Sequence, residues 1–125
     1  MALIRAHPDL AGKLALLDTM GNSGRAEFLP QLEAVIRGTE EARLRARAVF
    51  ALRFIEQPAA RALLLRELAQ GSPELREAAA AALGSGPWIE AYRAPLESCA
   101  AGETQERVRL QCQKALAANP AVAHK

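Results

Sequence analysis

The fold of this chain is decided by a nine-residue pattern that occurs three times: LRARAVFAL at 44–52, LREAAAAAL at 75–83 and VRLQCQKAL at 108–116. Each copy begins with an aliphatic residue and an arginine, has a small fifth residue, and ends with alanine and leucine. Positions one, five, eight and nine fall on one stripe of an α-helix. The pattern therefore predicts three equivalent helices, each with a small residue where a neighbouring helix approaches closely.

An amphipathic segment that ends in glycine precedes each of these helices. The three segments are AEFLPQLEAVIRG at 26–38, RALLLRELAQG at 61–71 and WIEAYRAPLESCAAG at 88–102. Glycine just past a helix is a common C-terminal cap, so Gly38, Gly71 and Gly102 are expected to end the first helices. The second helices are then expected to start after Thr39, Ser72-Pro73 or Glu103-Thr104. Each unit reads as a helix, a tight turn and a second helix.

This repeat resembles the HEAT-repeat family over about residues 23–118. In that family the second helix carries a hydrophobic-Arg pair followed by small and leucine positions, and the first helix contains a proline. The resemblance implies a short right-handed α-solenoid of about three helix pairs with an N-terminal capping element. Pro30 and Pro95 lie inside the first helices, where a missing N–H is expected to kink the backbone.

The arginine at the second pattern position departs from the family in its surroundings. The family usually has an aspartate in the turn that holds this arginine, whereas the acids near the turns here are Glu40, Glu41, Glu74, Glu103 and Glu106. Which of them holds Arg45, Arg76 or Arg109 is left open by the sequence.

Composition agrees with an all-α single domain of about seven helices. The apolar half of the chain is dominated by alanine and leucine, which favour helices, and the 125 residues suffice for one domain. We expect an N-terminal cap helix at 1–22, repeats at 23–56, 57–85 and 86–120, and a tail at 121–125. About three stacked units are needed before such repeats bury a stable core.

Charge and motif content argue against several classes of function. The net charge is only +2, so no long-range field favours nucleic acid or a membrane surface. No apolar run has the length of a transmembrane helix, and we expect a cytoplasmic protein without metal or cofactor. Cys99 and Cys112 lie on stripe positions of neighbouring helices, where we predict buried free thiols.

The opening stretch ALIRAHPDLAGK (2–13) is similar to the N-terminal signature of ureidoimidazoline decarboxylases of urate breakdown. That resemblance implies that His7 would act as the acid/base group. The family's later segments, a Glu-Gln followed by Gly-Leu and an aromatic stretch, are missing here. Catalysis of this kind needs a positioned carboxylate and a pocket as well as a base. Because Pro8 and Asp9 also suit the start of a helix, we predict a structural role and no enzymatic activity.

The sequence instead favours a non-enzymatic module or adaptor that binds a partner protein through the surface of its second helices. Phe50 lies off the buried stripe, and Ala81 and Lys114 occupy the equivalent positions in the other copies. An aromatic ring with arginines beside it is typical of binding hot spots. The predicted partner-binding residues are Arg43, Arg47, Phe50, Phe54 and Lys114.

Two alternatives remain open at this surface. The N-terminal segment could fold over Phe50 and Phe54 as a cap, which would remove them from any binding face. Alternatively, the cluster of Arg43, Arg45 and Arg47 could bind nucleic acid, with an affinity that falls as salt is added.

Overall fold

The computed structural model describes residues 9–38 and 41–120, and within these ranges the chain forms seven α-helices and no β-strand. The helices are α2 (Leu10–Ser23), α3 (Leu29–Arg37), α4 (Ala42–Ala51), α5 (Pro58–Gln70), α6 (Pro73–Ser85), α7 (Arg93–Gly102) and α8 (Glu106–Ala118). The predicted all-α class is confirmed.

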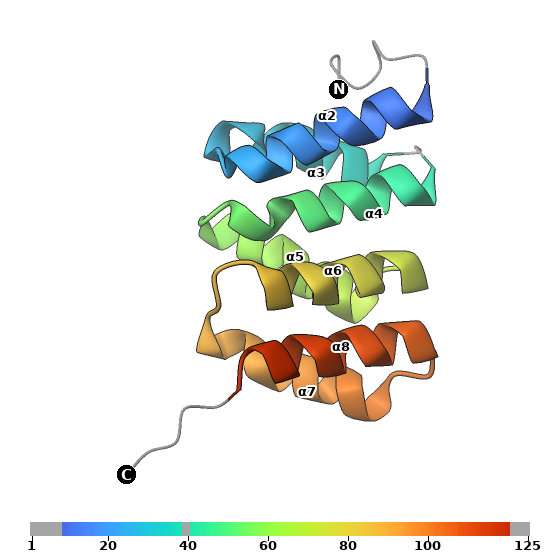
Figure 1. Cartoon of the computed structure of the whole chain (residues 1–125), viewed down its shortest axis with the longest axis vertical. Helices are drawn as coiled ribbons and strands as arrows, with labels where there is room; N and C mark the ends of the chain where they lie inside the picture. The colour runs from blue at the N-terminus through green and yellow to red at the C-terminus, as the bar shows by residue number, and fades with distance from the viewer. Residues whose placement is uncertain (1–8, 39–40, 121–125) are drawn as a thin grey trace.

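The helices form two layers (Figure 1). Helices α2, α4, α6 and α8 lie side by side in the first layer, in that order, and each contacts the next. Helices α3, α5 and α7 lie in the second layer, where each packs on the helix that follows it in sequence. Helices α3, α5 and α7 therefore each cover one side of the helix that follows them in sequence. Helix α2 packs on α4 at the end of the first layer.

The repeated pattern supplies the core between these layers. Leu44, Leu75 and Val108 are buried, and so are the small residues at the fifth position, Ala48, Ala79 and Cys112. The eighth position, Ala51, Ala82 and Ala115, is buried as well. The predicted stripe is confirmed as the buried face of α4, α6 and α8. At the ninth position Leu52 and Leu83 are buried, and Leu116 is partly exposed.

Glycines let neighbouring helices of the first layer approach closely. A Cβ atom on Gly21 of α2 would stand 2.9 Å from the Cα of Ala51, and one on Gly84 of α6 would stand 2.5 Å from the Cβ of Ala115. Ordinary carbon contacts lie at about 3.5–4.0 Å. Both glycines thus occupy positions where a larger side chain has no room.

The predicted kinks at Pro30 and Pro95 are wrong. Pro30 is the second residue of α3 and Pro95 the third residue of α7, so both prolines lie in the first helical turn. A missing N–H costs nothing there, because the first N–H groups of a helix have no partner within the helix. The residues just before α3 and α7 form separate 3₁₀ turns, Ala26–Phe28 and Glu90–Tyr92.

Helix ends follow the sequence signals in part. Asp9 caps α2 by accepting a hydrogen bond from the Gly12 N–H at 2.6 Å, and Ser72 caps α6 by accepting from the Leu75 N–H. The helix-start interpretation of residues 2–13 is therefore confirmed at Asp9. His7, Pro8 and Thr39 lie outside the described residues.

The last turn differs from the predicted one. Gly102 is the final residue of α7 rather than its cap, and α8 begins after Gln105 rather than after Thr104. Gly38 and Gly71 do follow α3 and α5 as predicted. The turn between α7 and α8 is therefore shifted by one residue along the chain and runs over Glu103, Thr104 and Gln105.

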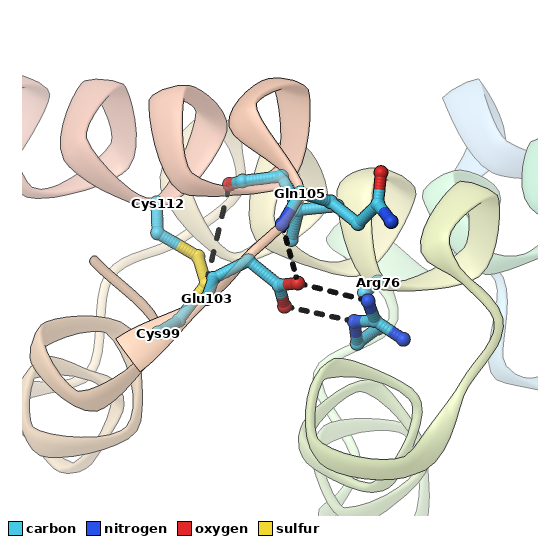
Figure 2. The surroundings of a disulfide bond; sticks show 6 residues. Arg76, Cys99, Glu103, Gln105 and Cys112 are labelled. Carbon is cyan, nitrogen blue, oxygen red and sulfur yellow. Dashed lines mark hydrogen bonds and ion pairs between the residues drawn. A yellow bond between two sulfur atoms is a disulfide. The ribbon is translucent and has the colours of Figure 1, made fainter. Parts of the chain in front are cut away.

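The prediction of free thiols is also wrong, because Cys99 of α7 and Cys112 of α8 form a disulfide bond (Figure 2). The two helices pack together, and the Cα atoms of the cysteines lie 6.1 Å apart. That separation is within the range a disulfide can bridge. Cys112 is buried as predicted, whereas Cys99 is only partly buried. Whether the two side chains meet depends on how α7 packs on α8.

Arg76 has a carboxylate partner in the following helix pair. Its Nε and Nη2 each donate to Glu103 at 2.9 Å (Figure 2). Its Nη1 donates to the Gly71 carbonyl at 2.8 Å. Glu103 also accepts a hydrogen bond from the Gln105 N–H at 3.1 Å. Of the acids near the turns, Glu103 therefore holds Arg76, and the pair links the α5–α6 turn to the α7–α8 turn.

The Arg76–Glu103 pair is expected to make stability depend on pH. Hydrogen bonds from Arg76 and from the Gln105 backbone lower the pKa of Glu103. A carboxylate with a lowered folded-state pKa stabilises the protein fully above its unfolded-state pKa, about 4.3, and this contribution is lost as pH falls through the folded-state pKa. The side chains of Glu103 and Arg76 are only 11% and 20% exposed, so solvent screens the pair weakly.

Glu103→Gln should therefore lower the free energy of unfolding by about 1 kcal/mol at neutral pH. The difference from wild type should shrink toward zero in strong acid, as measured by urea titrations across the pH range. Glu33→Gln is the control, because its pair with Arg37 is 42% and 52% exposed and should contribute less than about 0.5 kcal/mol. A pH-independent loss in Glu103→Gln would contradict the assignment.

Candidate binding groove

Two adjoining hollows run across α4, α6 and α8 on the surface of the first layer. One has a volume of about 270 Å³ and the other about 490 Å³. Phe50, Ala81 and Gln111 line both hollows, so they form one continuous depression. We call it the α4–α6–α8 groove.

The groove exists because one repeat position carries side chains of very different size. Phe50 on α4, Ala81 on α6 and Lys114 on α8 are equivalent residues, and all three line the groove. Alanine and glycine continue the floor along α6 at Ala78, Ala80 and Gly84. The alanines and the glycine of α6 carry only a methyl group or a hydrogen, whereas Phe50 on α4 and Lys114 on α8 are large. The surface over α6 is therefore depressed between them.

Phe50 is half-buried and packs against the edge of the core. The guanidinium of Arg53 lies 4.2 Å from the centre of its ring and 4.4 Å from that of Phe54. Arg53 is held by hydrogen bonds to Asn22 at 2.8 Å and to the Phe50 carbonyl at 3.2 Å. This cation–π arrangement fixes one side of the Phe50 ring and leaves another side toward the groove.

The described part of the N-terminal segment does not cover Phe50. No residue of α2 lines either hollow of the groove, and α2 instead contacts α4 and the turn Leu52–Phe54. Phe54 lies at that end of α4, beside Gly24, and is 38% exposed. The two phenylalanines thus have separate surroundings, although Arg53 touches both.

Charged side chains flank the apolar floor. Arg47 forms an ion pair with Asp18 of α2 at 2.7 Å, and Arg107 of α8 pairs with Glu77 of α6 at 2.7 Å. Arg43 is exposed, and no carboxylate pairs with it in residues 9–38 or 41–120. Lys114 is exposed near the other end of the groove. Among the described residues, Arg43 on α4 and Lys114 on α8 are thus the cations of the groove for which no carboxylate partner is seen.

Most of the residues predicted to bind a partner come together here. Arg43, Arg47, Phe50 and Lys114 line the groove, whereas Phe54 lines neither of its hollows. Sequence reasoning missed Ala81, Gly84 and Gln111. Alanine and glycine carry no chemistry of their own, and their role follows only from the larger side chains beside them.

The arginine cluster considered for nucleic acid does not form one surface. Arg43 and Arg47 line the groove, but Arg45 donates from its Nε to the Ile36 carbonyl at 2.8 Å and lines a different hollow. Alternate residues of a helix point in different directions. The sequence cluster is therefore divided between two surfaces in space.

Other kinds of site have little support among the described residues. Across 9–38 and 41–120, no group of three or more His, Cys, Asp or Glu side chains is placed to hold a metal ion. In the same ranges, no helix combines the length and apolar character needed to cross a membrane.

Comparisons with known proteins add no assignment: no family model, no curated protein and no solved structure matches the chain.

Proposed function

We propose that this chain is a non-enzymatic protein-interaction module of the HEAT-like α-solenoid kind, which binds a partner protein in the α4–α6–α8 groove. The proposal of a solenoid is supported by the threefold pattern and by the packing of each first helix on its second helix. Repeats of this kind present extended surfaces formed by equivalent elements of successive units.

The groove itself is the observation that carries the proposal. Its floor of alanine and glycine can accept an apolar side chain, and the Phe50 ring is held in place beside it by Arg53. Anchors that fill such pockets contribute most of the binding energy in protein interfaces. The exposed Arg43 and Lys114 favour acidic residues on either side of that anchor, and charges at the rim mainly increase the association rate.

Nucleic acid is the less favoured partner because Arg45 is directed away from Arg43 and Arg47. The proposal requires no cofactor. It does not depend on a cytoplasmic location, and the Cys99–Cys112 disulfide favours an oxidising compartment over the cytoplasm expected from the sequence. The proposal also gives His7 no catalytic role.

The partner can be captured with a photo-crosslinking amino acid at Gln111 in the groove. The same amino acid at Gln57, an exposed residue before α5, is the control. We expect crosslinks to a specific partner from position 111 and none from position 57. Crosslinks from position 57 alone would contradict the proposed surface.

Ala81→Glu should then weaken binding of that partner at least tenfold, about 1.4 kcal/mol, because it fills the floor where the apolar anchor would sit and places a negative charge near the acidic residues on either side of that anchor. Ala62→Glu introduces the same change at an exposed position of α5 and should alter affinity less than twofold. Calorimetric titration of both variants measures this difference. Equal binding by Ala81→Glu and wild type would overturn the groove as the binding site.

A further inference from the structure

A third hollow lies where the end of α3, the end of α5 and the start of α6 meet. It has a volume of about 410 Å³, and its polar lining includes Arg45, Arg66, Glu67, Gln70 and Ser72. None of its lining residues belongs to the α4–α6–α8 groove. We propose that this Arg45 hollow is a separate binding site for a carboxylate group, beyond the protein-binding function proposed above.

The chain contains an occupied example of such a site. Arg76 stands at the pattern position of Arg45 one repeat later, and each arginine donates to a carbonyl at the end of its preceding helix, Ile36 or Gly71. Arg76 uses its remaining edge to hold the Glu103 carboxylate through two hydrogen bonds. Paired, charge-assisted bonds of this kind are among the strongest that arginine makes.

The corresponding carboxylate for Arg45 is absent from the described residues. Glu103 lies six positions before Arg109, and the residue six positions before Arg76 is Gln70. Gln70 lines the Arg45 hollow, so the position that carries an acid in the last pair carries a neutral amide here. Within residues 9–38 and 41–120 the terminal nitrogens of Arg45 have no hydrogen-bond acceptor, and its Nε–H alone is used.

The surrounding charge favours an anion. Arg37, Arg45 and Arg66 line the hollow together with Glu67, and Arg37 is already paired with Glu33. The two positive charges of Arg45 and Arg66 thus exceed the single negative charge of Glu67, which leaves the hollow with a net positive charge. The backbone hydrogen bond to Ile36 fixes the Arg45 guanidinium before any ligand arrives, which reduces the entropy lost on binding. Because the Arg45 Nε–H is used by the Ile36 carbonyl, a carboxylate would bind across Nη1 and Nη2, whereas Glu103 binds Nε and Nη2 of Arg76.

The probe for this site is glutarate, titrated at constant ionic strength while the arginine Nε–H resonances are followed by NMR. We expect the Arg45 resonance to shift and saturate with a midpoint on the order of 10 mM, while the Arg76 resonance stays unchanged. The same shift with sodium chloride alone, or a shift that does not saturate, would overturn the proposal. Phosphate that binds as well as glutarate would overturn the carboxylate assignment.

Variants connect the shift to the hollow. Arg45→Gln and Gln70→Glu should each weaken glutarate binding at least tenfold, the first by removing the receptor and the second by supplying an acid from within the chain. Arg66→Gln, at an exposed position that carries little folding risk, should weaken it about threefold. Arg43→Gln is the matched control two residues from Arg45 and should have no effect. Unchanged binding in both Arg66→Gln and Gln70→Glu would contradict the site.

The source of the carboxylate can be separated with a second ligand. A peptide containing one glutamate between capped ends tests for a partner polypeptide, and glutarate tests for a free organic acid. Tighter binding of the peptide would assign the site to a polypeptide side chain, and tighter binding of glutarate would assign it to a small acid. Both results support a carboxylate site, and failure of either leaves the groove test above unaffected.

Discussion

Gly84→Ala is expected to lower the free energy of unfolding by about 3 kcal/mol, although alanine is the better helix former by about 1 kcal/mol. A Cβ atom at this position of α6 would stand 2.5 Å from the Cβ of Ala115 and 2.7 Å from its Cα. The second of these is a backbone atom, which cannot rotate away. Helices α6 and α8 would have to separate, and they form a large part of the packing between the last two pairs.

The matched control is Gly102→Ala. Gly102 is also helical, at the end of α7, but a Cβ atom there would meet nothing within 4 Å. It should therefore stabilise the protein by about 0.5 kcal/mol, because alanine loses less backbone entropy on folding. Urea titrations of both variants should show changes of opposite sign in the free energy of unfolding. If Gly84→Ala stabilised as much as Gly102→Ala, the close packing of α6 on α8 would be wrong.

A second substitution locates the clash. Ala115→Gly in the Gly84→Ala background removes the nearer of the two atoms, so part of the lost stability should return. We expect a coupling energy of at least about 1 kcal/mol in the double-mutant cycle, as found for residues in direct contact. Additive effects would show that the destabilisation arises elsewhere.

Reduction of the Cys99–Cys112 disulfide is expected to lower the free energy of unfolding by about 3 kcal/mol. The cysteines are 13 residues apart in sequence, and a cross-link that closes a loop of this size restricts the unfolded chain by about that amount. The bond ties α7 to α8 beside the turn that carries Glu103 (Figure 2). Loss of the cross-link should therefore weaken the last helix pair most.

Urea titrations with and without a reducing agent measure this effect, and hydrogen exchange should place the added opening in α7 and α8. The control is Cys99→Ala together with Cys112→Ala, in which the reductant should change nothing. Alkylation of the denatured protein before reduction provides the direct check. Two alkylated cysteines without reductant would contradict the disulfide.

Much of the helix arrangement was predictable from local chemistry. The spacing of Leu44, Ala48, Ala51 and Leu52 places apolar groups on one side of a helix whatever surrounds it, and its recurrence predicted α6 and α8 as well. Ser72 caps α6 with its own side chain, so no distant residue is needed. Signals of this kind act within a few residues of the chain, which is why they can be read from the sequence.

The candidate sites depended on the tertiary structure to different degrees. Arg43, Arg47, Phe50 and Lys114 could be selected because their types suit binding and they lie off the buried stripe. Their grouping into a groove required the side-by-side packing of α4, α6 and α8. The division of Arg45 from Arg43 and Arg47 required the position of the Ile36 carbonyl, which belongs to a different helix.

By itself, then, the sequence determined that this protein is a series of amphipathic helices with a repeated buried stripe. Only the tertiary structure decided that Cys99 meets Cys112, that Gly84 faces Ala115 and that Arg76 reaches Glu103. The physical reason is range: helical periodicity and capping act between residues a few positions apart. A disulfide, a steric limit or an ion pair depends instead on distances of a few ångströms between segments that only folding brings together.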